Sequence, residues 1–263
     1  MPQSNERPVI VGGSHRSGTT LLRRLLNGHR RLYCPPEVKF YKDLLRQFPD
    51  DPLAHGRLGA SISALGLPEE VWLDEFGRAL VRCYELAAAQ HGKRRWVDKN
   101  PENSINIWHW DRLLAQDFYF VLVVRHPFDI IASMHEIRMD RVIPTSVAGR
   151  AEHVGLYISS GLEYHDANPS RSSIVRYEDL VADPKNRLEK LLVRLGEEFD
   201  PGMLTNLNAG SQGSGLEDPK SRGRSHISDE SVKRWPGHFT DDDVTRLQDM
   251  LGDVIERLGY DLR

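Results

Sequence analysis

Apolar residues along the chain follow two patterns that alternate. Short runs rich in apolar and β-branched residues are typical of buried strands. They lie at Val9–Val11, Arg95–Val97, Phe118–Val124 and Ser172–Arg176. Segments with apolar residues at helical spacing predict helices at Thr19–Asn27, Glu37–Phe48, Glu69–His91, Ser104–Leu114, Pro127–Arg138, Pro184–Leu195 and Asp241–Leu258. Strands that alternate with helices indicate an α/β fold with a central, mostly parallel sheet flanked by helices.

The longest predicted helix carries its apolar residues on one side. Val71, Phe76, Leu80, Tyr84 and Ala87 recur along Glu69–His91 at helical spacing. We therefore expect these side chains to form the buried face of this helix.

Composition limits the class of protein. No linker or charge block divides the 263 residues, so we expect one domain, 1–263, with a flexible N-terminus at 1–8. A formal net charge of -3 gives no global bias toward nucleic acid. A polar start and the lack of any run of about 18 apolar residues favour a cytoplasmic protein without a membrane span. The two cysteines, Cys34 and Cys83, are expected as free thiols, and the His and Cys residues lack metal-ligand spacing, so we expect no metal.

The stretch VIVGGSHRSGTTLL, from Val9 to Leu22, has the outline of a phosphate-binding loop between a strand and a helix. Gly13 and Gly18 have the spacing of a Walker A loop, but Thr19 stands where the lysine belongs, and the cation is Arg16. Backbone N–H groups at the helix N-terminus would still hold an anion. The alternative is that the glycines only make a turn.

The predicted strand ends carry cations where a magnesium nucleotide site would need an acid. These ends give Lys99, Arg125 and Arg176, and the nearest acid, Asp98, directly precedes Lys99. The pattern favours a phosphate-bearing donor that is handled by cations and hydroxyls.

A second anion site is predicted after the strongest strand. Arg125 follows this strand directly, and Ser133 lies eight residues on in the next helix. The guanidinium and the hydroxyl could together hold a phosphate at the carboxyl edge of the sheet. The alternative is an ion pair between Arg125 and Asp129, one turn away.

Together these motifs resemble those of the sulfotransferases that use 3′-phosphoadenosine 5′-phosphosulfate (PAPS). The opening loop resembles that family's 5′-phosphosulfate loop, and Arg125 with Ser133 resembles its 3′-phosphate motif. RYEDLVADP, from Arg176, resembles the segment whose tyrosine, here Tyr177, lies near the adenine. SVKRWPGHFT and LGYD resemble the C-terminal segment that folds over the nucleotide, and CPPE and DKNP are closest in style to the tyrosylprotein sulfotransferase branch.

The resemblance implies roles for individual residues. Arg16 and the N–H groups of Ser17, Gly18, Thr19 and Thr20 would hold the transferring group, and Lys99 would contact the leaving oxygen. Glu37 would be the general base; the alternative is that it stabilises a helix N-terminus. A histidine could also be the base, and the rivals are His15, His109 and His135. Of these, His109 is expected to pack instead. The co-substrate would be PAPS, the product adenosine 3′,5′-bisphosphate (PAP), and no metal would be needed.

The Gly- and Ser-rich segment 209–235 is interpreted as a mobile lid that closes over the nucleotide, or else as a solvated loop. The nucleotide-binding residues expected in it are Arg222, Arg224, Lys233, Arg234 and Trp235.

The acceptor pocket is expected among 37–47, 69–91 and 138–165, where Arg138, Arg141 and Arg150 would meet an acidic acceptor or be solvated. A hydroxyl (or amine) of a small metabolite, lipid or carbohydrate is favoured as acceptor. No nucleic acid partner is expected, and whether the protein forms a homodimer stays open.

The alternatives to sulfuryl transfer are a P-loop kinase with a displaced cation and a non-catalytic nucleotide-binding protein of the same fold.

Overall fold

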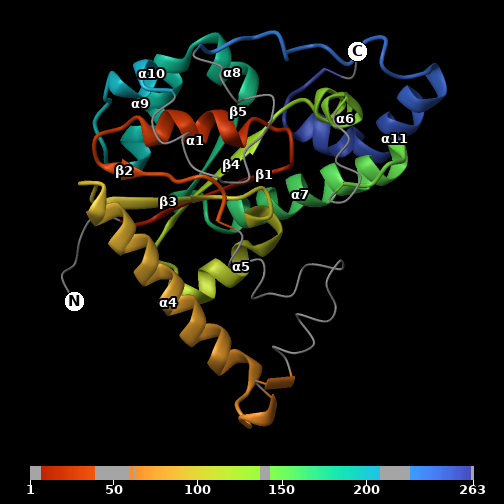
Figure 1. Cartoon of the computed structure of the whole chain (residues 1–263). Helices are drawn as coiled ribbons and strands as arrows, with labels where there is room; N and C mark the ends of the chain where they lie inside the picture. Colours follow the sequence, from red (N-terminus) through yellow and green to blue (C-terminus); the bar gives the residue numbers. More distant parts are fainter. Residues whose placement is uncertain (1–6, 39–59, 62, 137–142, 208–225, 262–263) are drawn as a thin grey trace.

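A computed structural model describes residues 7–38, 60–61, 63–136, 143–207 and 226–261 of the chain. Its centre is a five-stranded, wholly parallel sheet in the order β2-β3-β1-β4-β5 (Figure 1). The strands are β1 (Val9–Gly13), β2 (Leu32–Tyr33), β3 (Arg95–Lys99), β4 (Tyr119–Val124) and β5 (Ser172–Arg176). The predicted α/β class and the four predicted strands are confirmed. The short strand β2 was not predicted, because two residues show no periodicity.

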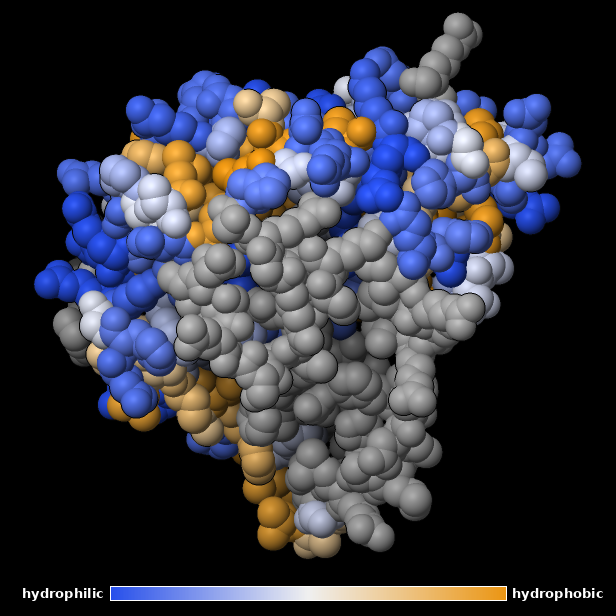
Figure 2. Space-filling view, turned by 45° about the horizontal axis from the view of Figure 1, so that its top comes forward, coloured by the Kyte–Doolittle hydropathy of each residue, from blue (hydrophilic) through white to orange (hydrophobic). Residues whose placement is uncertain are grey.

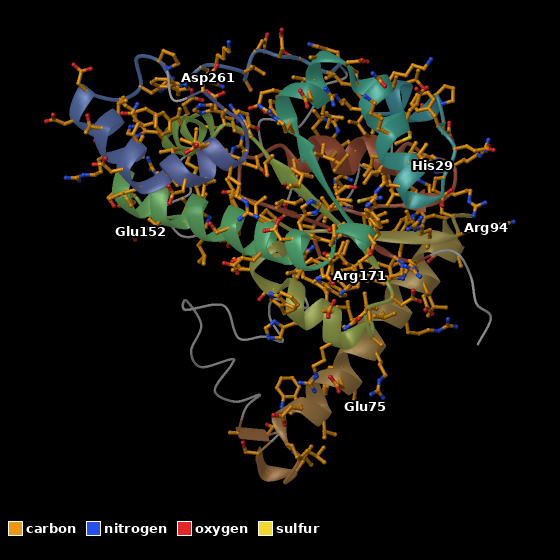
Figure 3. The ribbon with its side chains drawn as sticks, turned by 180° about the vertical axis from the view of Figure 1, so that it is seen from behind. His29, Glu75, Arg94, Glu152, Arg171 and Asp261 are labelled. Atoms are coloured by element: carbon orange, nitrogen blue, oxygen red, sulfur yellow. The ribbon has the colours of Figure 1, made fainter. Side chains whose placement is uncertain are left out.

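Helices cover both faces of the sheet, as Figures 1 and 3 show from opposite sides. The helices described are α1 (Thr19–Asn27), α4 (Glu69–Gln90), α5 (Asn103–Leu113), α6 (Pro127–Glu136), α7 (Val147–Ala167), α8 (Tyr177–Ala182), α9 (Pro184–Leu195), α10 (Gly202–Thr205) and α11 (Asp241–Arg257). A 3₁₀ turn covers Pro169–Arg171. The predicted helices that fall on described residues are confirmed in position, whereas most of the one expected at Glu37–Phe48 lies outside the described residues.

The alternation of side chains along β1 and β4 divides the core into two layers. Ile10, Phe120 and Leu122 point to one face, where they join a cluster with α5, α6, α7 and α11. Val11 and Val121 point to the other face, against α1 and α9. Because both faces are covered, the central strands are apolar throughout, which is why the sequence pattern identified them.

The predicted buried face of α4 is wrong at its N-terminal end. Leu80 and Tyr84 are buried as expected, but Val71 and Phe76 are exposed, and Trp72 is buried instead. The N-terminal part of α4 extends away from the sheet (Figure 1), and apolar residues gather at this end of the molecule in Figure 2. The spacing of apolar residues predicts one side of a helix, but it does not predict which turns of the helix extend beyond the rest of the protein.

Candidate active site

The carboxyl ends of the parallel strands bring the predicted site residues to one edge of the sheet. β1 is paired with β3 so that Val11 lies opposite Lys99, and with β4 so that Gly13 lies opposite Val123, two residues before Arg125. β5 pairs Arg176 with Val124. Residues from four strands therefore meet at the crevice where ligands of such sheets bind.

The loop after β1 is shaped by backbone conformations that side chains seldom adopt. Gly13 and Gly18 have φ angles of 154° and 99°, and Arg16 itself has a φ of 70°. A Cβ on Gly13 would lie 2.5 Å from the carbonyl oxygen of Val123, and one on Gly18 would lie 2.4 Å from Cδ2 of Tyr177. The loop can therefore sit this close to β4 and α8 only with glycine at both positions.

The two predicted anion motifs form one site. Arg16 Nε donates a hydrogen bond to Ser133 Oγ at 3.2 Å, and Arg125 Nη1 donates to the backbone oxygen of Arg16 at 3.1 Å. Burial lowers the pKa of Arg125, which opposes the charge of this guanidinium, while Asp129, 4.0 Å away, favours it. Arg125 thus contacts the loop and faces Asp129, as the ion-pair alternative expected, while anion binding by Arg125 and Ser133 stays a prediction.

Two buried polar side-chain atoms of the described residues in this region lack a hydrogen-bond partner. Among the described residues, Ser17 Oγ and Arg125 Nε are buried side-chain atoms without a hydrogen-bond partner. A buried donor left unpaired is costly, and a phosphate oxygen would satisfy it. This observation fits an anionic nucleotide.

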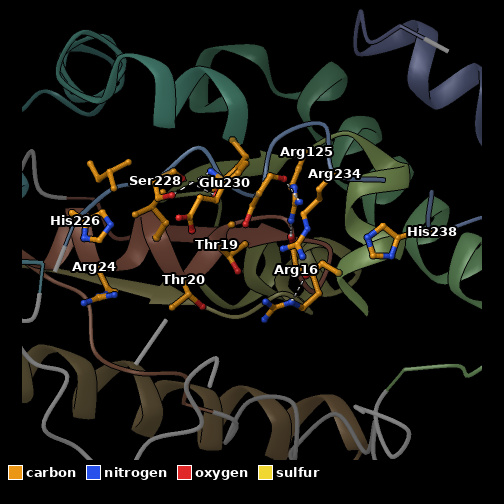
Figure 4. A pocket seen from close by; sticks show the side chains of 16 residues that line it. Arg16, Thr19, Thr20, Arg24, Arg125, His226, Ser228, Glu230, Arg234 and His238 are labelled. Carbon is orange, nitrogen blue, oxygen red and sulfur yellow. Dashed lines mark hydrogen bonds between the residues drawn. The ribbon is translucent and has the colours of Figure 1, made fainter. Parts of the chain in front are cut away.

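A cavity of about 640 Å³ opens over this edge (Figure 4). Its cations are Arg16, Arg24, Arg125 and Arg234. It is also lined by Gly18, Thr19, Thr20, Ser133 and Tyr177 from the predicted set, and by Leu21, His226, Ile227, Ser228, Glu230, Ser231 and His238, which the sequence did not single out. Four guanidinium groups around one cavity match a ligand with several negative charges.

The predicted base and the predicted leaving-group cation meet beside α1. Lys99 is 2% exposed and its Nζ is ion-paired with Oε1 of Glu37. The same Nζ donates a hydrogen bond to Thr20 Oγ1 at 3.3 Å. Glu37 and Lys99 therefore lie next to the first turn of α1, where the loop would hold the transferring group.

The neighbouring Asp98 holds the residues around Lys99 by hydrogen bonds. Its buried carboxylate accepts hydrogen bonds from the hydroxyl of Tyr84 and from the amides of Asn100 and Asn103. Burial and this carboxylate raise the pKa of Tyr84, so the hydroxyl stays a donor. The network fixes the turn that follows Lys99, the last residue of β3.

The segment after the undescribed residues 208–225 crosses the cavity. Its backbone is held by Asp129, which is 1% exposed and accepts hydrogen bonds from the N–H groups of Lys233 (2.8 Å), Arg234 (2.8 Å) and Trp235 (2.9 Å). The backbone oxygen of Ser231 accepts a hydrogen bond from Arg125. Asp129 was predicted only as an alternative partner of Arg125, because backbone donors leave no trace in a sequence.

The lid residues named from the sequence divide into three groups. Arg234 lines the cavity and is ion-paired with Glu136. Lys233 and Trp235 are not among the residues lining the cavity, and Trp235 packs edge-on against Phe128, with ring centroids 5.2 Å apart. Arg222 and Arg224 lie outside the described residues.

The three rival histidines have different surroundings. His15 is buried between His153, at 3.2 Å from its Nδ1, and Glu102, at 3.5 Å from its Nε2. His109 is exposed on α5 rather than packed as expected. His135 Nδ1 lies 3.0 Å from Nη1 of Arg150. Arg150 itself is buried, so this arginine is neither solvated nor presented to an acceptor. Arg138 and Arg141 lie outside the described residues.

The described residues hold neither a membrane-spanning helix nor a metal-binding cluster. No helix among them is long and apolar enough to cross a membrane. Over the same ranges, no group of three or more His, Cys, Asp or Glu residues is arranged to hold a metal ion.

Comparisons with known proteins agree on one family. The model of the sulfotransferase family matches residues 8–201. Nodulation protein NoeE of Sinorhizobium fredii is 27% identical over 280 residues, covering 95% of this chain but only 65% of NoeE. Protein-tyrosine sulfotransferase 2 of Gallus gallus is 27% identical over 281 residues, covering 98% of this chain and 71% of that protein.

Solved structures share the fold over nearly the whole chain. The sulfotransferase domain from the Synechococcus PCC 7002 olefin synthase has a TM-score of 0.72 at 25% identity, covering 100% of this chain and 98% of that domain. The sulfotransferase domain from the curacin biosynthetic pathway has a TM-score of 0.72 at 22% identity, covering 98% and 99%.

Proposed function

The chain belongs to the sulfotransferase family, and from that premise we propose that it moves a sulfuryl group from PAPS to a hydroxyl or amine of a small-molecule, lipid or carbohydrate acceptor. The observation that carries the proposal is the hydrogen bond from Arg125 to the backbone of Arg16, which joins two anion sites in one cavity. A donor with phosphate groups at both the 5′ and the 3′ positions has the charge pattern that such a double site requires.

Each phosphate is assigned to residues of this chain. The N–H groups of Gly18, Thr19 and Thr20 at the start of α1 would hold the 5′-phosphosulfate. Arg125 and Arg234, which both line the cavity, would hold the 3′-phosphate. Arg125 Nε, which belongs to a lining residue, would gain the hydrogen-bond partner that it lacks.

The reaction is an in-line transfer of SO₃ to the acceptor. Bound PAPS supplies the sulfuryl group and a leaving phosphate oxygen. Lys99, beside Thr20, would neutralise the charge that develops on that oxygen, and Arg16 would stabilise the equatorial oxygens. Glu37 would take the proton from the acceptor, so its ion pair with Lys99 must loosen when acceptor and donor enter. No protein-bound metal takes part in this proposal.

Calorimetric titration of PAP, with EDTA and with Mg²⁺, tests the donor. Tight binding that does not depend on the metal would support PAPS use. ATP binding that Mg²⁺ strengthens, without PAP binding, would favour the kinase alternative, although no observation on the site prefers it. Incubation with labelled PAPS and a panel of phenols, hydroxylated lipids and sugars would then identify the acceptor. PAP binding without transfer to any member would indicate a non-catalytic nucleotide-binding protein.

A further inference from the structure

One acid stands among the cations of the cavity. Of the described residues that line it, only Glu230 carries a carboxylate, while Arg16, Arg24, Arg125 and Arg234 carry guanidinium groups. A carboxylate repels the oxygens of a phosphate, whereas it can accept a hydrogen bond from a hydroxyl group of the ligand. Glu230 is therefore the lining residue that the two-phosphate assignment does not explain.

The backbone on both sides of Glu230 is fixed to the floor of the cavity. Before it, the backbone oxygen of Ser228 accepts a hydrogen bond from the hydroxyl of Tyr177 at 3.4 Å, and Ser228 Oγ accepts one from the N–H of Glu230 at 3.2 Å. After it, the backbone oxygen of Ser231 is bound by Arg125. In Figure 4, Glu230 lies between Ser228 and Arg125, over Thr19 at the start of α1.

This position corresponds to the middle of the nucleotide. The loop at Gly18–Thr20 is assigned to the 5′ group and Arg125 to the 3′-phosphate, so the ribose that joins them must lie between these two sites. Of the ribose hydroxyls, only the 2′-hydroxyl is free in a nucleotide substituted at both 3′ and 5′. A carboxylate that accepts a hydrogen bond from a ribose hydroxyl is also the device by which other doubly wound folds read a nucleotide.

We propose that Glu230 determines specificity for a ribonucleotide donor by accepting a hydrogen bond from its 2′-hydroxyl. The inference rests on the proposed function, because it uses the positions assigned to the two phosphates. A hydrogen bond to a charged acceptor sets the expected size of the effect at roughly tenfold or more. The same carboxylate would also reject a nucleotide that carries its phosphate at the 2′ position, since two anions would then meet.

The test compares PAP with 2′-deoxyadenosine 3′,5′-bisphosphate by calorimetry in the wild type and in variants. The wild type should bind PAP about tenfold or more tightly than the deoxy analogue. Glu230→Ala should bring this ratio close to one, and Glu230→Gln, which keeps a neutral acceptor oxygen, should give an intermediate ratio. Asp229→Ala is the matched control, because Asp229 precedes Glu230, is exposed and does not line the cavity.

Each result decides between explanations. The proposal would be overturned if the ratio of the two affinities were the same in the wild type and in Glu230→Ala. If Glu230→Ala bound both ligands more tightly by the same factor, the carboxylate would only repel phosphate, and this result too would overturn the proposal. Inosine 3′,5′-bisphosphate is the further probe: if Glu230→Ala removed discrimination against this ligand and not against the deoxy analogue, the carboxylate would read the 6-amino group of the base. Failure of the wild type to bind PAP at all would overturn the proposed function, and this inference with it.

Discussion

The ammonium group of Lys99 is ion-paired with the carboxylate of Glu37, although the two residues are 62 positions apart in the sequence. In this arrangement each group compensates the charge of the other in a site with little access to solvent. In the proposed reaction, the leaving phosphate oxygen of the donor would compete for Lys99 and release the carboxylate for the acceptor. The order of binding and the state of the base would thereby be linked.

Replacing Glu37 by glutamine should slow transfer by about a hundredfold or more, because a positioned general base contributes factors of this size. PAP affinity should stay within about threefold of the wild type, since Glu37 does not line the described cavity. Labelled PAPS, with the acceptor found in the screen, gives the rate. Glu75→Gln, an exposed acid paired with Arg78, is the control. Unchanged transfer in Glu37→Gln would return the role of base to a histidine.

Arg125→Ala should weaken PAP binding by roughly 10- to 150-fold, the worth of hydrogen bonds to a charged group. The affinity for adenosine 5′-phosphate, which lacks the 3′-phosphate, should fall by less than about threefold in the same variant. Calorimetry with both nucleotides measures this difference, and Arg78→Ala on exposed α4 controls for the loss of a positive charge. If both nucleotides were weakened equally, Arg125 would act on the loop as a whole and not on the 3′-phosphate.

Asp129→Asn should release the segment that crosses the cavity. An amide cannot accept the three hydrogen bonds from Lys233, Arg234 and Trp235 as a carboxylate does. Amide hydrogen exchange of residues 231–236 should speed up by about tenfold or more, while exchange in β4 stays unchanged. PAP affinity should fall together with this protection. Slow exchange in the variant would show that the other contacts of the segment, such as the hydrogen bond from Arg125 to Ser231 and the packing of Trp235, are enough to hold it.

Gly18→Ala should cost about 1–3 kcal/mol in the free energy of unfolding from backbone strain, plus the cost of displacing Tyr177. Gly92→Ala separates the two contributions, because Gly92 has a φ of 67° but its added Cβ would have no atom within 4 Å. Denaturant unfolding of both variants gives the comparison. Equal losses would mean that the ring of Tyr177 moves aside at no cost.

The two thiols should differ in reactivity. Cys34 is fully buried, and burial raises the pKa of its thiol to about 12, whereas Cys83 is exposed. Only a thiolate reacts well with a disulfide reagent such as DTNB. Cys83 should therefore react in the native protein, and Cys34 only after unfolding. Mass spectrometry of the labelled peptides identifies the site; rapid labelling of Cys34 in the native state would contradict its burial.

The sequence predicted those parts of the molecule whose signal is local. β4 was evident because both of its faces are buried, and the loop after β1 because its glycines mark a turn. The helix α7 was not delimited, since Gly149, Gly155 and Gly161 interrupt its pattern. Gly161 has a tertiary reason: a Cβ there would lie 2.4 Å from Cδ1 of Leu122.

Contacts between residues far apart in the sequence could not be predicted, because they leave no local pattern. The sequence placed Ser133 with Arg125, but the hydroxyl of Ser133 is bound by Arg16, from a loop that only the sheet order brings near. Asp129 acts on backbone groups, and Glu230 matters through its position in the cavity. Neither role is marked by a residue pattern.

The contact between Gly18 and the ring of Tyr177 also has a consequence during synthesis on the ribosome. The loop is synthesised before β4, α6 and α7, whereas Tyr177 follows only after these elements have been made. Until then the nascent chain has a phosphate loop without one of its walls. Unfinished or truncated chains that end before β5 would therefore be poor competitors for the cell's nucleotide supply.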